Sequence, residues 1–143
     1  MLVAQILQGK GGVVHAVAHE ASLQEAAREL TARKVGCVVV LDADNEIVGI
    51  LSERDIVREV AKHGPKCLDD TVGSAMTRSV VTADVEETID DCLARMTDRR
   101  IRHLPVVREG RMIGIVSIGD LVKWKIETVE VEAAAMRAYI ATG

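Results

Sequence analysis

Two stretches of this sequence, GILSERDIV at residues 49–57 and GIVSIGDLV at residues 114–122, share Gly, two apolar residues, Ser, two variable residues and Asp in the same order. The two glycines, Gly49 and Gly114, lie 65 positions apart. Upstream segments align as well, with residues 38–40 opposite residues 104–106. Self-similarity at a fixed spacing indicates two copies of one structural unit.

Each copy predicts the same series: a short strand, a helix, two strands in a hairpin and a second helix. The short strands are expected at residues 13–14 and 80–81. The first helices are indicated by apolar residues spaced three and four apart. Ser22 and Thr88 are the expected N-caps, each with an acidic residue three positions on, Glu25 and Asp91, to complete a capping box. The helical apolar residues are Leu23, Ala26, Ala27 and Leu30 in one copy, and Ile89, Cys92, Leu93 and Met96 in the other.

The hairpins follow from β-branched runs on either side of turn-forming residues. Residues 38–41 and 47–51 flank the turn at 42–45, and residues 106–107 and 112–116 flank Glu109-Gly110. Continuous apolar runs favour strands covered on both faces, and therefore an α/β (α+β) fold. Gly64-Pro65 should end a helix, so we expect a first repeat at 1–66 and a second at 67–143.

The last twenty or so residues predict an extended amphipathic helix without Gly or Pro interruptions before the terminal residue. Its apolar stripe could pack on its own domain or on a second copy of the chain. The stripe consists of Leu121, Val122, Ile126, Val129, Ala133, Met136 and Ile140.

Composition narrows the possible functions. The 143 residues are 48% hydrophobic but only 1% aromatic, and the formal net charge is −4. Proteins that bind single-stranded nucleic acids stack the bases on aromatic side chains and bind the backbone with a basic surface. A nucleic-acid partner is therefore not expected. The three cysteines, Cys37, Cys67 and Cys92, suit a reducing compartment. No apolar run reaches the ~18 residues of a membrane helix, so we expect a cytoplasmic protein with no membrane partner.

Enzyme signatures do not occur in the sequence, which has no G-x-S-x-G, H-E-x-x-H, Walker or G-x-G-x-x-G pattern. The glycine-rich residues 9–12 are expected to form a flexible loop. His15 and His19 could share a metal ion only on a helix, and that stretch is predicted as strand and loop. We therefore expect no catalytic residues and no metal site.

The Ser and Asp of each repeated segment lie where a strand ends and a helix begins. Free backbone N–H groups at such a junction can bind a phosphate together with the serine hydroxyl, and the carboxylate can accept the two hydroxyls of a ribose. The simpler alternative is that Ser and Asp only cap the second helix.

The repeated unit resembles the cystathionine-β-synthase (CBS) domain, and the pair resembles the tandem arrangement called a Bateman module. The resemblance rests on residues 49–55 and 114–120 in register and covers nearly the whole chain. It implies two βαββα repeats packed about a pseudo-twofold axis, with the extended helix at the C-terminus. It also implies two clefts, each taking Ser and Asp from one repeat and other walls from its partner.

Carried over residue by residue, the resemblance implies two unequal nucleotide sites. Arg102 and His103 would face the phosphate of the main site, whereas the second site has no such cation and should bind more weakly. The main site would comprise Ser52, Arg54, Asp55, Ser74, Thr82, Arg102 and His103, and the second Gln5, Gly36, Cys37, Ser117 and Asp120.

The resemblance further implies a regulatory, signal-transducing function. The ligand would be an adenine nucleotide, AMP, ADP or ATP, with NAD(H) or S-adenosylmethionine as alternatives. A ligand-independent interaction or dimerisation scaffold is the other alternative. Partners would be the nucleotide, a second copy in a homodimer, and an unidentified target protein.

Overall fold

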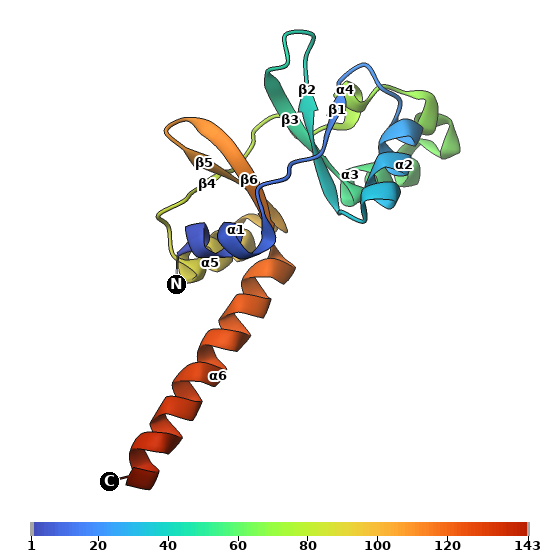
Figure 1. Cartoon of the computed structure of the whole chain (residues 1–143). Helices are drawn as coiled ribbons and strands as arrows, with labels where there is room; N and C mark the ends of the chain where they lie inside the picture. Colours follow the sequence, from blue (N-terminus) through green and yellow to red (C-terminus); the bar gives the residue numbers. More distant parts are fainter. Residues whose placement is uncertain (1, 143) are drawn as a thin grey trace. The chain divides into compact units, whose positions relative to one another are not determined.

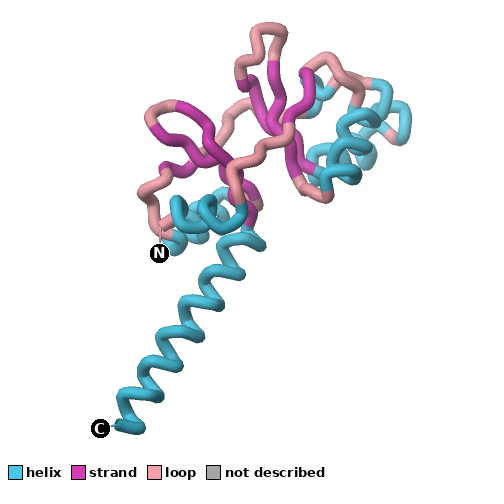
Figure 2. Tube along the Cα trace, viewed as in Figure 1, coloured by secondary structure: helices cyan, strands magenta, loops and turns pink. Residues whose placement is uncertain are grey.

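The computed structural model describes residues 2–142 and divides the chain into two compact units. One unit is Val14–Val80, which we call the Asp55 unit. The other contains the chain up to Val13 together with the chain from Val81 onward, and we call it the Asp120 unit. Each is built on one three-stranded sheet with helices, so the mixed α/β fold predicted from the repeat is confirmed (Figure 2).

The Asp55 unit contains strands β1 (Ala16–Ala18), β2 (Cys37–Leu41) and β3 (Ile47–Ser52) in that order across the sheet. β1 runs parallel to β2, and β2 pairs antiparallel with β3. Its helices are α2 (Leu23–Arg33), α3 (Glu53–His63), the 3-10 helix η1 (Pro65–Asp69) and α4 (Val72–Ala75) (Figure 1).

The Asp120 unit repeats this plan with β4 (Ala83–Asp84), β5 (His103–Arg108) and β6 (Arg111–Ser117). β4 is parallel to β5, and β5 is antiparallel to β6. Its helices are α1 (Val3–Lys10), α5 (Ile89–Arg99) and α6 (Ile118–Thr142). Both copies therefore contain the predicted strand, helix, hairpin and helix.

The helix starts predicted from the capping residues are confirmed. The Ser22 hydroxyl accepts a hydrogen bond from the Glu25 amide at 3.1 Å, and the Thr88 hydroxyl accepts one from the Asp91 amide at 3.1 Å. Each hydroxyl thus satisfies one of the N–H groups that a helix start leaves without an intrahelical partner.

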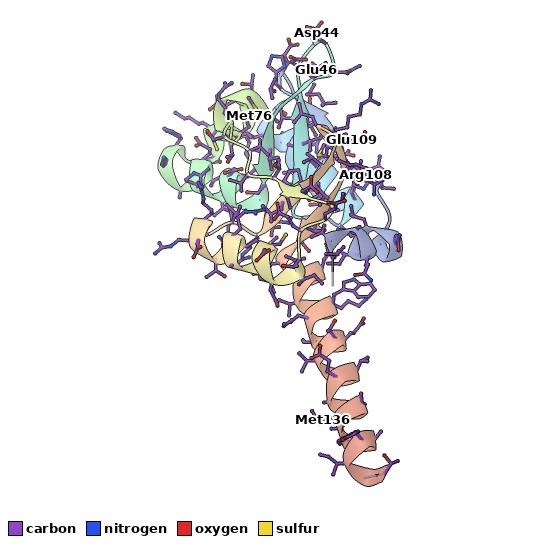
Figure 3. All side chains as sticks on the ribbon, turned by 90° about the vertical axis from the view of Figure 1, so that its left-hand side faces the viewer. Asp44, Glu46, Met76, Arg108, Glu109 and Met136 are labelled. Atoms are coloured by element: carbon purple, nitrogen blue, oxygen red, sulfur yellow. The ribbon has the colours of Figure 1, made fainter. Side chains whose placement is uncertain are left out.

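The hairpin turns also fall where the sequence places them. The Asp42 carboxylate accepts hydrogen bonds from the amides of Asp44 and Glu46, at 2.9 and 3.0 Å. In the second hairpin Glu109 and Gly110 take positive φ angles of 51° and 77°. Figure 3 labels Asp44 and Glu46 at one tip and Arg108 and Glu109 at the other.

The short first strands differ from the prediction by about three residues. They lie at Ala16–Ala18 and Ala83–Asp84 rather than at residues 13–14 and 80–81, and Val13 is exposed. Ala16 pairs with Val39 and Ala83 with Val106. The position of each short strand is set by its register against a long neighbour, which local apolarity does not reveal.

Both cores are aliphatic, as the composition predicts. Leu23, Val38 and Leu51 have no exposed surface in the Asp55 unit, and neither do Ile6 and Leu104 in the Asp120 unit. Apolar side chains from several helices and one sheet thus build each core separately.

The N-terminal segment belongs to the unit formed by the second repeat, which changes the division at residue 66 expected from sequence. Val3 donates its amide to the Glu87 carbonyl at 3.0 Å, and in the Asp55 unit Val72 donates equivalently to Ala21 at 2.7 Å. α1 and α4 thus cover matching positions of the two units. The physical reason is that α1 buries Val3, Ile6 and Leu7 in the core of the Asp120 unit.

The expected flexible loop at residues 9–12 is partly wrong, because Gly9 and Lys10 form the last turn of α1. Gly9 packs so tightly on the Trp124 ring that a Cβ atom there would lie 3.0 Å from it. Burial of the helix against α6 therefore fixes a stretch whose local composition indicates flexibility.

Helix α6 is 25 residues long and buries Leu121 in the core of its unit. Its C-terminal part projects beyond the sheet and other helices of that unit, and carries Met136 near its end (Figures 1 and 3). Within residues 2–142 no helix has both the length and the apolarity needed to cross a membrane.

Candidate functional site

The Asp55 junction lies where β3 ends and α3 begins. Ser52 and Asp55 form a reciprocal capping box: the Ser52 hydroxyl accepts from the Asp55 amide at 3.3 Å, and the Asp55 carboxylate accepts from the Ser52 amide at 2.9 Å. The Ser52 hydroxyl also lies 3.2 Å from the same carboxylate, as a donor. The alternative of a helix cap is therefore realised in this structure.

The Asp55 carboxylate has two further partners and is almost fully enclosed. Arg58, one turn along α3, forms an ion pair with it, and the Thr77 hydroxyl donates a long hydrogen bond of 3.5 Å. Only 6% of the Asp55 side chain is exposed. A ribose could reach these oxygens only by replacing some of the existing donors.

The Asp120 junction repeats the serine cap but has a different cationic partner. The Asp120 carboxylate accepts from the Ser117 amide at 2.8 Å, and the Ser117 hydroxyl accepts from the Asp120 amide at 3.1 Å. Lys10, at the end of α1, reaches the same carboxylate at 2.6 Å and donates to the Ile115 carbonyl at 2.9 Å. The ammonium group of the Lys10 side chain therefore lies at this junction.

The Lys10 contact also sets the protonation of Asp120. Burial alone would raise the pKa of this carboxyl, but the hydrogen bonds from Lys10 and Ser117 outweigh it, so the pKa lies below its ordinary value. Asp120 is thus held as a carboxylate. Its side chain is 26% exposed, several times more than that of Asp55.

The glycine that opens each repeated segment permits a close approach. A Cβ atom at Gly49 would lie 2.6 Å from the Thr77 carbonyl oxygen, and one at Gly114 would lie 2.7 Å from the Leu7 side chain. The first glycine thus lets residue 77 pair with β3, where its amide and carbonyl bond to Ile50 at 2.8 and 3.0 Å. The second lets α1 cover β6.

Each junction has neighbours from its own hairpin. Gly36 accepts from the Glu53 amide at 3.0 Å, and Cys37 pairs with Ser52 across the sheet. At the matching place in the other unit, the Arg102 carbonyl accepts from the Ile118 amide at 2.8 Å, and His103 pairs with Ser117.

Within a unit, Arg102 and His103 therefore lie beside the Asp120 junction. The Arg102 side chain is exposed and His103 is half-buried. Their assignment to the site of Ser52 and Asp55 stays a prediction.

The remaining predicted site residues lie at the surface. Arg54 lines an open hollow on α3 beside Arg58. Ser74, in α4, donates its hydroxyl to the Thr71 carbonyl at 2.6 Å.

Two more predicted residues belong to the Asp120 unit. Thr82 is exposed and accepts through its carbonyl from Arg95 at 3.0 Å. Gln5, on α1, accepts from the Leu2 amide at 2.8 Å.

Sequence reasoning missed Lys10, Arg58 and Thr77. A signal for Lys10 exists, because Val3, Ile6 and Leu7 have helical spacing and predict a helix that ends near residue 10. Nothing local, however, connects residue 10 with residue 120. Across residues 2–142, no group of three His, Cys, Asp or Glu side chains is arranged to hold a metal ion.

The CBS domain family model matches the chain twice, at residues 13–62 and residues 72–127. The chain belongs to the CBS domain family. Each match contains one of the two Ser and Asp junctions, so the resemblance stated from the repeated segments is confirmed.

Solved CBS proteins share this fold. A CBS-domain containing protein of Agrobacterium tumefaciens is 45% identical, with a TM-score of 0.83 and coverage of 85% of this chain and 91% of that one. The CBS domain protein PAE2072 of Pyrobaculum aerophilum, complexed with AMP, is 28% identical, with a TM-score of 0.73 and coverage of 84% and 89%.

The CBS domain pair of protein MJ0100, in complex with 5′-methylthioadenosine and S-adenosyl-L-methionine, is 28% identical. Its TM-score is 0.76, with coverage of 90% of this chain and 98% of that one. Adenosine-containing ligands thus occur in CBS pairs of this fold. The chain spans 57–71% of the length of the first three curated relatives that it matches.

Proposed function

We propose that this CBS pair is a regulatory module that binds an adenine nucleotide, AMP, ADP or ATP, at its Ser and Asp junctions. The observation that carries the proposal is the duplicated junction, in which a serine hydroxyl, a carboxylate and a helix N-terminus meet in both units. These groups match the acceptors and donors of a ribose phosphate. The AMP complex of the Pyrobaculum protein supports the same ligand class.

We also propose that the Asp120 junction contributes more to phosphate binding than the sequence indicates. Its carboxylate is more exposed than that of Asp55, Lys10 contacts it, and the backbone of Arg102 lies at the same junction. This reverses the order expected from sequence, which assigned Arg102 and His103 to Asp55. A charged donor to phosphate contributes roughly 1.5–3 kcal/mol, enough to change a Kd about tenfold or more.

S-adenosylmethionine is the second candidate ligand, since the MJ0100 pair was determined with it and with 5′-methylthioadenosine. Neither of these ligands carries a phosphate. Cations should therefore matter less for them, and substitution of Lys10 separates the two ligand classes.

Calorimetric titration of the purified chain with AMP, ADP, ATP, NAD and S-adenosylmethionine tests the proposal, and adenosine serves as the control ligand without a phosphate. We expect one of the adenine nucleotides to bind, and Lys10→Met to weaken that binding about tenfold while leaving adenosine binding within about twofold. Lys62→Met, an exposed lysine on α3, is the matched control and should change neither.

Several results would contradict the proposal. Absence of heat and of any shift in melting temperature with all five ligands would reject nucleotide sensing, because a ligand that binds only the native state must stabilise it. Binding of S-adenosylmethionine alone, unaffected by Lys10→Met, would favour the second candidate. Equal weakening of adenosine and AMP would reject Lys10 as a phosphate ligand.

A further inference from the structure

Apart from the exposed Val131 and Tyr139, six apolar residues of α6 follow a seven-residue pattern. From residue 122 onward they are spaced four, three, four, three and four positions apart. In heptad notation the a positions are 126, 133 and 140, and the d positions are 122, 129 and 136. Alternating spacings of three and four are typical of helices that pair along one seam. The seam residues are Val122, Ile126, Val129, Ala133, Met136 and Ile140.

This seam is not the face by which α6 packs on its own unit. Leu121 and Trp124 make the contacts with the core and with α1. At 100° per residue, Leu121 lies about 100° and Trp124 about 160° around the helix from the centre of the seam. Val129 is 49% exposed and Met136 61% exposed. Figures 1 and 3 show this part of α6 beyond the other elements of its unit.

The charges beside the seam identify the partner and its direction. In a parallel pair, each g residue faces the e residue five positions later on the other helix. Glu132 at g would face Arg137 of a second copy, and Lys125 at g would face Glu130. Both contacts join opposite charges. Lys125 already forms an ion pair with Asp90 on α5, at 2.9 Å, so its contact with Glu130 would compete with an existing one. The contact between Glu132 and Arg137 is therefore the better one to test.

An antiparallel pair with the same seam fully overlapped would place like charges together. Glu130 would face Glu130 of the second copy, and Glu132 would face Glu132. Lys123 would face Arg137. Like-charge contacts beside a coiled-coil seam disfavour an arrangement, so the charge pattern discriminates against this one.

The helix is also suited to stand away from its unit. Residues 133–135, 138 and 141 are alanines, the best helix former, and they follow the last residues that pack on α1. β-Branched residues at a favour two strands in a parallel coiled coil when Leu occupies d. Here Ile occupies two of the three a positions, and the d positions are Val122, Val129 and Met136.

We propose that residues 122–140 of α6 form a parallel two-stranded coiled coil with α6 of a second copy of this chain. The seam of six apolar side chains is buried between the two helices, and Glu132 of each copy pairs with Arg137 of the other. The inference is independent of nucleotide binding, because none of these residues belongs to either junction.

Two valines of α6 provide a matched test of the seam. Val129 is at d, in the seam, and Val131 is at f, on the opposite side of the helix; both are exposed. Sedimentation velocity of the full chain should show a dimer for the native sequence and for Val131→Glu, and a monomer for Val129→Glu. Circular dichroism and the thermal unfolding transition confirm that the units remain folded.

Charge substitutions test the pairing between copies. Glu132→Arg and Arg137→Glu each bring like charges together in a parallel pair and should each weaken dimerisation several-fold. The double variant restores opposite charges and should recover most of the affinity. Recovery requires residue 132 of one copy to lie against residue 137 of the other.

Cross-linking tests direction separately. Ile140→Cys places a thiol at an a position near the end of the seam, and oxidation should give a disulfide dimer because the two copies meet there. In the antiparallel pair these thiols would be about 27 Å apart, at 1.5 Å per residue. Ala138→Cys, at f, is the control that should cross-link poorly. Cys37, Cys67 and Cys92 are buried and do not compete.

Specific results would overturn the proposal. A monomeric native chain at tens of micromolar, a dimer that survives Val129→Glu, or a trimer would each reject the two-stranded seam. A dimer without a cross-link at residue 140 would reject the parallel direction. Nucleotide titration of the same variants tests the proposed function separately, because these substitutions leave both junctions unchanged.

Discussion

Asp55 and Asp120 occupy the same position in the two repeats, but their carboxylates are held by different parts of the chain. Asp55 is enclosed by Arg58 from its own helix and by Thr77 from the segment that follows α4. Asp120 is half-open and bound by Lys10, which is 110 residues away in sequence. The duplicated segment therefore fixes the serine cap in both units, while the surroundings decide how accessible the carboxylate is.

The glycines that open the two repeated segments also differ in what surrounds them. Gly49 faces backbone, the Thr77 carbonyl, whereas Gly114 faces the end of the Leu7 side chain. A side chain can rotate away from a new methyl group more easily than a paired backbone can move. Identical motif residues in the two copies should therefore tolerate substitution differently.

The largest effect should come from the glycines. Gly49→Ala should lower the free energy of unfolding by about 2–3 kcal/mol, because the added methyl group displaces the paired segment at residue 77. Gly114→Ala should lower it by about 1 kcal/mol, since Leu7 can take another rotamer. Urea unfolding followed by circular dichroism measures both. Equal losses would show that the two close approaches are equivalent.

A smaller difference is expected between the two carboxylates. Asp55→Ala should cost about 2 kcal/mol, because it removes an enclosed carboxylate that accepts from four donors, and Asp120→Ala about 1 kcal/mol. Asp55→Asn keeps an acceptor oxygen and should recover part of the loss. The same unfolding measurement applies, and a greater loss at Asp120 would contradict the comparison. Because Asp55→Ala weakens the cap, Asp55→Asn is the better variant for binding studies.

The smallest effect should be the pH dependence that Lys10 confers. Since the pKa of Asp120 is lowered from its ordinary value of 3.8, the contact stabilises the protein above that pH, and the contribution is lost as the pH falls through the lowered pKa. Lys10→Met should therefore cost up to about 1 kcal/mol at pH 7. The difference from the native chain should shrink below about pH 4. Unfolding curves at pH 7 and pH 3 test this, and an unchanged difference would contradict it.

Much of the fold was predictable because its signals are local. Ser22 and Thr88 predicted their helices through side-chain caps, and the turn at residues 42–45 predicted its hairpin. The short strands were displaced by about three residues because pairing with β2 and β5, and not local apolarity, sets their register. The Ser and Asp pairs were correctly placed at strand-to-helix junctions because the repeat itself marks them.

By itself, the sequence determined the duplicated unit, its caps and turns, and the serine and aspartate of each junction, since these depend on residues within a few positions of one another. Only the tertiary structure decided that α1 packs with the second repeat, that Lys10 meets Asp120, and that Asp55 is enclosed while Asp120 is half-open. The physical reason is burial. Burial of Val3, Ile6 and Leu7 in the core of the Asp120 unit fixes the position of α1, and α1 in turn places the Lys10 side chain beside Asp120. No local sequence pattern specifies this packing.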